Sequence, residues 1–189
     1  MKLQIKIQKI ICILALISGA LCFIFAIGIT TDIYNLYLTS ALKDFDGMEI
    51  FNEIQPFNSQ LVKVSILMIL VAVLLFITNT NKRRNYYISN YVVTALVAAT
   101  NIIASLWAIK NINIFKIKFK TETDFKKYFD IYNTNKKILV NVKYTESTFY
   151  FDISQATFII SIIISIILVG NLIWKTILMN KEKRLLANK

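Results

Sequence analysis

Four stretches of this chain contain no charged residue, and each has about the length of a helix that crosses a bilayer. They cover residues 10–31, 64–81, 85–109 and 153–174. Hydrophobic residues make up 56% of the 189-residue chain, more than is typical of a soluble domain. We therefore predict an all-α membrane protein, a bundle of four transmembrane helices at residues 10–31, 63–81, 91–110 and 153–175.

The first stretch also has features of a signal peptide, because MKLQIKIQK precedes an apolar run that contains the small residues Ser18, Gly19 and Ala20. The apolar run continues past this possible cleavage site through FIFAIGIT. We therefore expect the first stretch to remain as a membrane anchor.

Basic residues gather on one side of the predicted helices. This side comprises residues 1–9, the turn 82–90 and the tail 176–189, and its basic residues include Lys2, Lys6, Lys9, Lys82, Arg83, Arg84, Lys181, Lys183, Arg184 and Lys189. The first loop on the other side, residues 32–62, is acidic, and Lys43 is its one basic residue. The other outer loop, residues 111–152, is rich in lysine, but its lysines are interspersed with acidic residues, and longer translocated segments obey the charge rule weakly. We predict that both termini lie in the cytoplasm and that the protein sits in a bacterial plasma membrane.

The outer loop 111–152 has the pattern of a small folded unit. Phe115, Ile117 and Phe119 alternate with lysines, which predicts a strand. Residues 125–132 have helical spacing, and residues 138–144 and 148–153 are two further candidate strands. A unit this small buries little surface alone, so we predict that it joins the first outer loop in a small α+β cap. The aromatic face of its helix is a candidate docking surface for a partner, and it consists of Phe125, Tyr128, Phe129 and Tyr132.

Small and polar residues follow one face of the first, third and fourth predicted helices. Small residues allow helices to approach closely, and hydroxyl and amide groups can form hydrogen bonds between helices in lipid. The residues that carry this prediction are Gly19, Thr94, Asn101, Ser105, Ser161, Ser165 and Asn171. We interpret them as packing residues; the alternative is a polar track for a solute. No charged residue lies deep in a predicted span, which argues against an ion-coupled pump or carrier.

The side-chain inventory excludes several kinds of chemistry. The chain has no histidine, which removes the commonest general base and all His-based metal sites. Cys12 and Cys22 are about 15 Å apart on one predicted helix, beyond the reach of a disulfide. We expect no enzymatic activity, no cofactor, no metal site and no nucleic-acid partner.

These patterns favour a non-catalytic accessory or scaffold subunit of a larger membrane assembly, such as a transport or secretion complex. Its partners would be the lipid bilayer and other integral membrane subunits, and Lys82, Arg83 and Arg84 are candidate cytoplasmic contacts. One alternative is a small oligomeric channel or carrier lined by Asn101, Ser161, Ser165 and Asn171. Another alternative is an immunity or exclusion protein against a membrane-active toxin.

Overall fold

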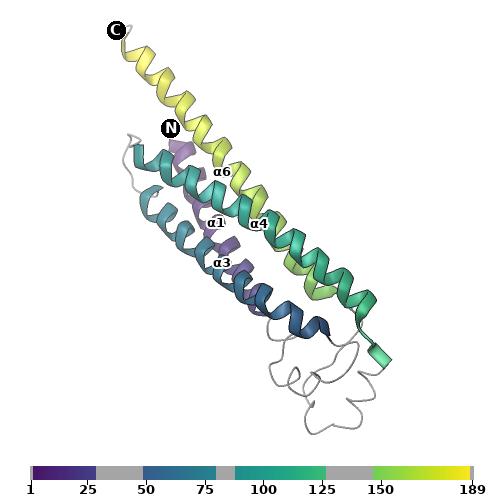
Figure 1. The fold of residues 1–189 in the computed structure, drawn as a ribbon. Coiled ribbons are helices and arrows are strands. Elements are labelled where there is room, and N and C mark those ends of the chain that lie inside the picture. Colours follow the sequence, from purple (N-terminus) through teal and green to yellow (C-terminus); the bar gives the residue numbers. More distant parts are fainter. Residues whose placement is uncertain (1, 29–48, 80–87, 127–146, 188–189) are drawn as a thin grey trace.

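The computed structural model describes residues 2–28, 49–79, 88–126 and 147–187 of the chain (Figure 1). These residues form four long helices, α1 (Lys2–Gly28), α3 (Glu49–Asn79), α4 (Ile88–Glu122) and α6 (Phe149–Ala187). Each helix is long and apolar enough to cross a membrane. The predicted helix bundle with four candidate spans is therefore confirmed, and the chain is a multi-pass membrane protein that contacts the lipid bilayer.

The helices form a closed ring in which each packs against two others. Helix α3 packs against α1 and α4, and α6 packs against α4 and α1. Successive helices run in opposite directions, so the two ends of the chain lie at the same end of the bundle (Figure 1). Short turns between antiparallel neighbours are the simplest route through such a bundle.

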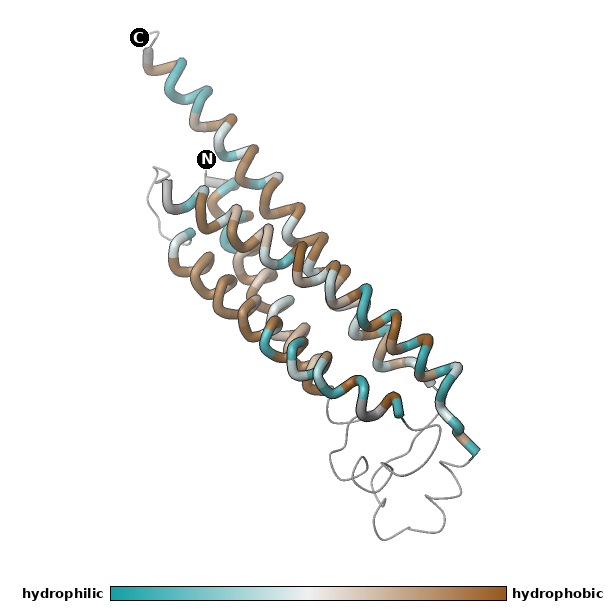
Figure 2. The backbone as a smooth tube through the Cα atoms, in the orientation of Figure 1, coloured by the Kyte–Doolittle hydropathy of each residue, from teal (hydrophilic) through white to brown (hydrophobic). Residues whose placement is uncertain are grey.

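Two hydrophobic clusters fill the interior, one toward each end. The cluster at the end with the chain termini joins α1, α3, α4 and α6 and comprises Ile11, Cys12, Ala15, Val71, Leu75, Val93, Val97 and Leu168. The cluster at the opposite end is rich in aromatic residues, and its members include Ile50, Ile54, Phe57, Leu61, Ile112, Phe119, Phe151 and Phe158. Most of the large exposed hydrophobic residues are isoleucine and leucine, as lipid contact requires. Figure 2 shows hydrophobic residues along much of all four helices.

The predicted α+β cap is wrong where the structure describes it. Residues 115–119 lie in α4 and residues 149–153 lie in α6, so neither segment is a strand. Phe115 and Phe119 are one helical turn apart on the inner side of α4, whereas Ile117 is 54% exposed. The alternation with lysine therefore arises on a helix, where Phe115 and Phe119 share a face at i, i+4 spacing. The candidate strand at residues 138–144 lies outside the described residues.

Helices α3 and α4 extend the bundle well beyond the predicted spans. Helix α3 begins at Glu49, within the segment predicted as the first outer loop, and α4 continues to Glu122. At 35 residues, α4 is about 52 Å long, against a hydrocarbon core of about 30 Å. The aromatic cluster thus continues from the predicted spans into a helical extension at the end of the bundle opposite the chain termini.

Candidate functional site

A network of amide side chains joins all four helices at the end of the bundle that carries the chain termini. Gln8 of α1 donates from Nε2 to Asn79 Oδ1 of α3 over 3.1 Å, and Asn90 of α4 donates to the same oxygen over 3.0 Å. Gln4 of α1 donates to Asn171 Oδ1 of α6 over 3.4 Å. Gln4, Gln8, Asn79 and Asn171 are all buried. The network therefore fixes how the four helices meet at this end.

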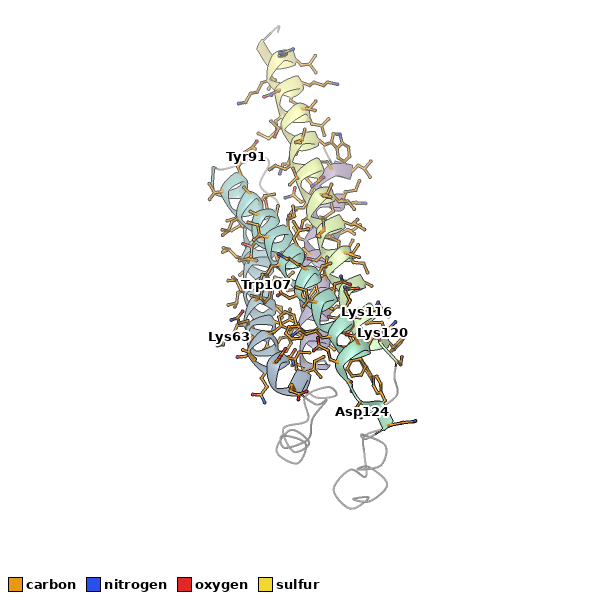
Figure 3. The ribbon with its side chains drawn as sticks, turned by 45° about the vertical axis from the view of Figure 1, so that its right-hand side comes forward. Lys63, Tyr91, Trp107, Lys116, Lys120 and Asp124 are labelled. Carbon is orange, nitrogen blue, oxygen red and sulfur yellow. The ribbon has the colours of Figure 1, made fainter. Side chains whose placement is uncertain are left out.

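Two further features lie beside the amide network. The Tyr91 hydroxyl of α4 is 3.1 Å from Thr176 Oγ1 of α6, so one of the two donates to the other. Lys175, one residue earlier on α6, is only 6% exposed although it is a lysine. Figure 3 shows Tyr91 near the start of α4, far along that helix from Lys116 and Lys120. Polar contacts thus hold α4 against α6 at this end of the bundle.

Hydroxyl groups occupy the interior further along the bundle. Ser65 and Ser165 each donate to the carbonyl four residues earlier on the same helix, over 2.8 Å and 2.9 Å. Ser105 and Ser161 are equally buried, but their hydroxyls have no hydrogen-bond partner among the described residues. The interior therefore contains two kinds of serine, one satisfied within its own helix and one not.

Ion pairs tie the helical extension together at the opposite end. Lys118 of α4 pairs with Glu53 of α3, and Lys116 of α4 pairs with Asp152 of α6. These residues lie outside the spans predicted from the sequence. The hydrogen bond from the Lys116 ammonium lowers the pKa of the Asp152 carboxyl below its ordinary value. The hydrogen bond to Glu53 raises the pKa of Lys118. Thr148 also donates to Asp152 across the first turn of α6. Helix α4 is thus held to both of its neighbours.

The structure brings six of the predicted packing residues into the interior of a single bundle. They are buried side chains on α4 and α6, namely Thr94, Asn101, Ser105, Ser161, Ser165 and Asn171. The seventh, Gly19, lies against α3, where a Cβ atom on it would be 3.4 Å from the backbone nitrogen of Ile69. Small and polar residues on these faces therefore point toward neighbouring helices.

The predicted docking face is described only at its first residue. Phe125 packs edge-on against Phe119, with ring centroids 5.3 Å apart, and belongs to the aromatic cluster. Residues 125 and 126 are helical, and the rest of the helix predicted at residues 125–132 lies outside the described residues. The other predicted docking residues, Tyr128, Phe129 and Tyr132, lie outside the described residues, as do the cytoplasmic candidates Lys82, Arg83 and Arg84.

Sequence reasoning missed the amide network and a buried asparagine. Gln4 and Gln8 lie among lysines before the first charge-free stretch, so they were predicted to belong to a polar N-terminal segment. Their i, i+4 spacing was the available signal that they share a helical face. Asn58, only 1% exposed, lay within the predicted outer loop, and neither atom of its amide has a partner in the described part of the chain.

The final turns of α6 extend beyond the rest of the bundle (Figure 1). Leu185 and Leu186 near their end are 69% and 73% exposed. Lys181, Lys183 and Arg184 in the same turns are also exposed. We refer to residues 177–187 as the α6 arm. It presents leucine and basic side chains at the end of the bundle that carries both termini.

Within residues 2–28, 49–79, 88–126 and 147–187, no group of three or more Cys, Asp and Glu side chains is placed to hold a metal ion. Cys12 and Cys22 are both buried and unbridged. The chain matches no model of a known protein family, no curated protein sequence and no solved structure. Any functional conclusion therefore depends on the geometry of the bundle itself.

Proposed function

We propose that the protein is a non-catalytic accessory or scaffold subunit of a larger membrane assembly, such as a transport or secretion complex. In this proposal it resides in a bacterial plasma membrane with both termini in the cytoplasm. The α6 arm would then extend into the cytoplasm, where it can reach another component of the assembly. The four helices would hold this arm at a defined place in the membrane.

The α6 arm is the observation that carries the proposal. Helix α6 contains 39 residues and is about 58 Å long, roughly twice the thickness of a hydrocarbon core. Leu185 lies ten residues beyond the end of the predicted span, which corresponds to about 15 Å of helix. The headgroup layer on one side of a bilayer is only about 5–8 Å thick. The exposed pair Leu185 and Leu186 would therefore lie in water unless another protein covers it.

The interior of the bundle gives less support to a pore formed between copies of the chain. Asn101, Ser161, Ser165 and Asn171 are the residues expected to line such a pore, and their exposed fractions are 3%, 1%, 1% and 7%. They face the centre of one bundle and not its lipid-facing surface. Copies that associate side by side would meet through isoleucine and leucine side chains, so a shared pore would not be polar.

Co-purification from the native membrane tests the proposal. The chain with Leu185→Ala and Leu186→Ala should lose its partner in mild detergent, because the exposed apolar pair at the end of the arm is removed. The matched control is Leu3→Ala, since Leu3 is a 65% exposed leucine at the same end of the bundle, on α1. The control should retain the partner. If the unmodified protein runs as a lone monomer in every mild detergent, the accessory-subunit proposal fails.

A further inference from the structure

Several buried polar side-chain atoms have no hydrogen-bond partner among the described residues, and they include four oxygen atoms on α1, α4 and α6. These four are the hydroxyl oxygens of Ser18, Ser105 and Ser161 and the amide oxygen of Asn101. The four residues are at most 3% exposed. Native proteins satisfy the great majority of their buried polar groups, so four such atoms in one region need a physical explanation.

These atoms lie within about two helical turns of one another along the bundle. Tyr91 contacts Thr176, and Lys116 pairs with Asp152, which together set the register of α4 against α6. Ser105 and Ser161 lie at closely matching distances along the two helices from these contacts. Asn101 is one helical turn from Ser105 on the same face of α4. The Gln4–Asn171 contact places Ser18 of α1 within about one turn of Ser161.

The hydroxyls of Ser18, Ser105 and Ser161 do not donate to a backbone carbonyl of their own helix. A buried serine in a helix commonly donates to the carbonyl four residues earlier, as Ser65 and Ser165 do here. No such bond forms at Ser18, Ser105 or Ser161 within the described structure. Their hydroxyls are therefore available to a molecule between the helices. We call Ser18, Asn101, Ser105 and Ser161 the central polar layer.

We infer that the central polar layer binds a small, neutral, hydrogen-bonding molecule that is shared by α1, α4 and α6. The ligand is neutral because the layer contains hydroxyl and amide groups and no charged side chain, and an ion buried without a counter-charge is strongly disfavoured. It is small because fully buried side chains occupy the neighbouring positions, including Met68, Ala108 and Phe158. Water and small polyols both have the required chemistry. Hydroxyl and amide groups can donate to and accept from such a ligand.

A double-mutant cycle on the full chain in lipid nanodiscs tests for a shared ligand. Ser105→Ala and Ser161→Ala should each lower the apparent melting temperature, because each removes a bond to the ligand. The shift in the double variant should differ from the sum of the single shifts, since the first substitution already weakens the site. Ser65→Ala is the matched control: its hydroxyl is bonded within α3, and its shift should add to that of Ser105→Ala. If Ser105→Ala and Ser161→Ala each raise the melting temperature, the hydroxyls have no ligand and the inference is wrong.

Nuclear magnetic resonance of the same nanodisc samples distinguishes the two sources of ligand. Magnetisation transfer from water to the side-chain amide of Asn101, lost in the Ser105→Ala and Ser161→Ala double variant, identifies water. A saturable shift of the Asn101 amide resonance on titration with glycerol, also lost in the double variant, identifies a small polyol. If Asn101 receives no transfer from water and shows no shift with glycerol, the site binds neither and the inference is overturned.

Discussion

At Gly19 a side chain would lie directly against the backbone of a neighbouring helix. A Cβ atom at this position would lie 3.4 Å from the backbone nitrogen of Ile69 and 3.5 Å from its Cα. These distances are ordinary contacts for a single methyl group, but they leave no room for a longer side chain. At Gly170 on α6, by contrast, an added Cβ would meet nothing within 4 Å. The two glycines therefore have different roles although both lie in membrane-spanning helices.

Replacement of Gly19 by leucine should push α1 away from α3. Overpacking of this kind typically costs about 1–3 kcal/mol of folding free energy. We expect Gly19→Leu to lower the free energy of unfolding by this amount, measured in mixed micelles by denaturant titration. Gly170→Leu is the matched control and should be neutral or slightly stabilising, because glycine is a poor helix former and the site is open. Equal losses for both variants would contradict close packing at Gly19.

Asn79 is the residue through which the amide network connects three helices. Its amide oxygen accepts from Gln8 of α1 and from Asn90 of α4, and its own amide group donates to Thr78 over 3.4 Å. Replacement by leucine removes all three bonds and leaves Gln8 and Asn90 with only backbone carbonyls of α3, at 3.4 Å and 3.3 Å.

We expect Asn79→Leu to lower the free energy of unfolding by roughly 1–3 kcal/mol, because it removes two hydrogen bonds between helices and each contributes about 0.5–1.5 kcal/mol. Thr78→Val is the control, since it removes the bond from Asn79 to Thr78 and other bonds within α3 but no bond between helices. This variant should change stability much less. Indistinguishable unfolding curves for Asn79→Leu and the unmodified chain would show that the network does not stabilise the bundle.

Among the four helices, α4 differs most from the structure that its local sequence pattern predicts. The run FKIKFK alternates like a strand, yet it forms the last full turns of a 35-residue helix. Phe115 stacks on Phe57 of α3 at 5.1 Å, and Phe119 lies 5.6 Å from Phe151 of α6. Lys116 and Lys118 reach acidic residues on both neighbours. Contacts with α3 and α6 thus favour a helix over the local preference for a strand.

The helical extension can be tested by comparing two apolar residues that a strand would bury together. Phe119 is 2% exposed and Ile117 is 54% exposed. Phe119→Ala should destabilise the protein by about 3–5 kcal/mol, whereas Ile117→Ala should cost well under 1 kcal/mol. Thermal unfolding in detergent, followed by circular dichroism, measures both. A similar large loss at both positions would indicate that residues 115–119 bury one strand face instead.

At the scale of the whole molecule, closure of the ring depends on contact between the first and last helices. Gln4 of α1 and Asn171 of α6 are distant in sequence and form a hydrogen bond inside the bundle. Membrane helices lack a strong hydrophobic force that drives them together, so such polar contacts and close packing determine which helices become neighbours. The same contacts set the register that brings the central polar layer together.

Engineered cysteines at Gln4 and Asn171 should be joined by a short bifunctional thiol crosslinker, in a chain whose Cys12 and Cys22 are replaced by alanine. The Gln4 and Asn171 amide groups meet in the folded bundle, so the two thiols should lie within reach of a short spacer, and crosslinking should be rapid and nearly complete, as shown by a mobility shift on gels. The control places one cysteine at Leu3 instead of Gln4, because Leu3 is 65% exposed on α1. Crosslinking of the control pair at the same rate would contradict the α1–α6 contact.

The sequence predicted the number of helices and a set of small and polar residues that lie in the interior, because long charge-free stretches and helical spacing are properties of single segments. It could not predict where the helices end outside the membrane. Pro56 in α3 and the alternating run FKIKFK in α4 both disfavour a helix locally. These segments are helical because of their contacts with neighbouring helices. Gln4 and Gln8 lie among Lys2, Lys6 and Lys9, and their i, i+4 spacing did not by itself mark them as buried. Their burial depends on α3 and α6, which lie far along the chain.

By itself, the sequence determined that this chain forms four apolar helices with polar residues along particular faces, because hydrophobicity and helical period are encoded locally. The tertiary structure decided which faces meet, how far the bundle extends beyond the predicted spans, and which polar groups are satisfied. It joined Gln8, Asn79 and Asn90 in one network and placed Ser18, Ser105 and Ser161 within about two helical turns of one another. Those outcomes depend on register and on long-range packing, since the contribution of a polar group to stability depends on the partner that packing brings to it.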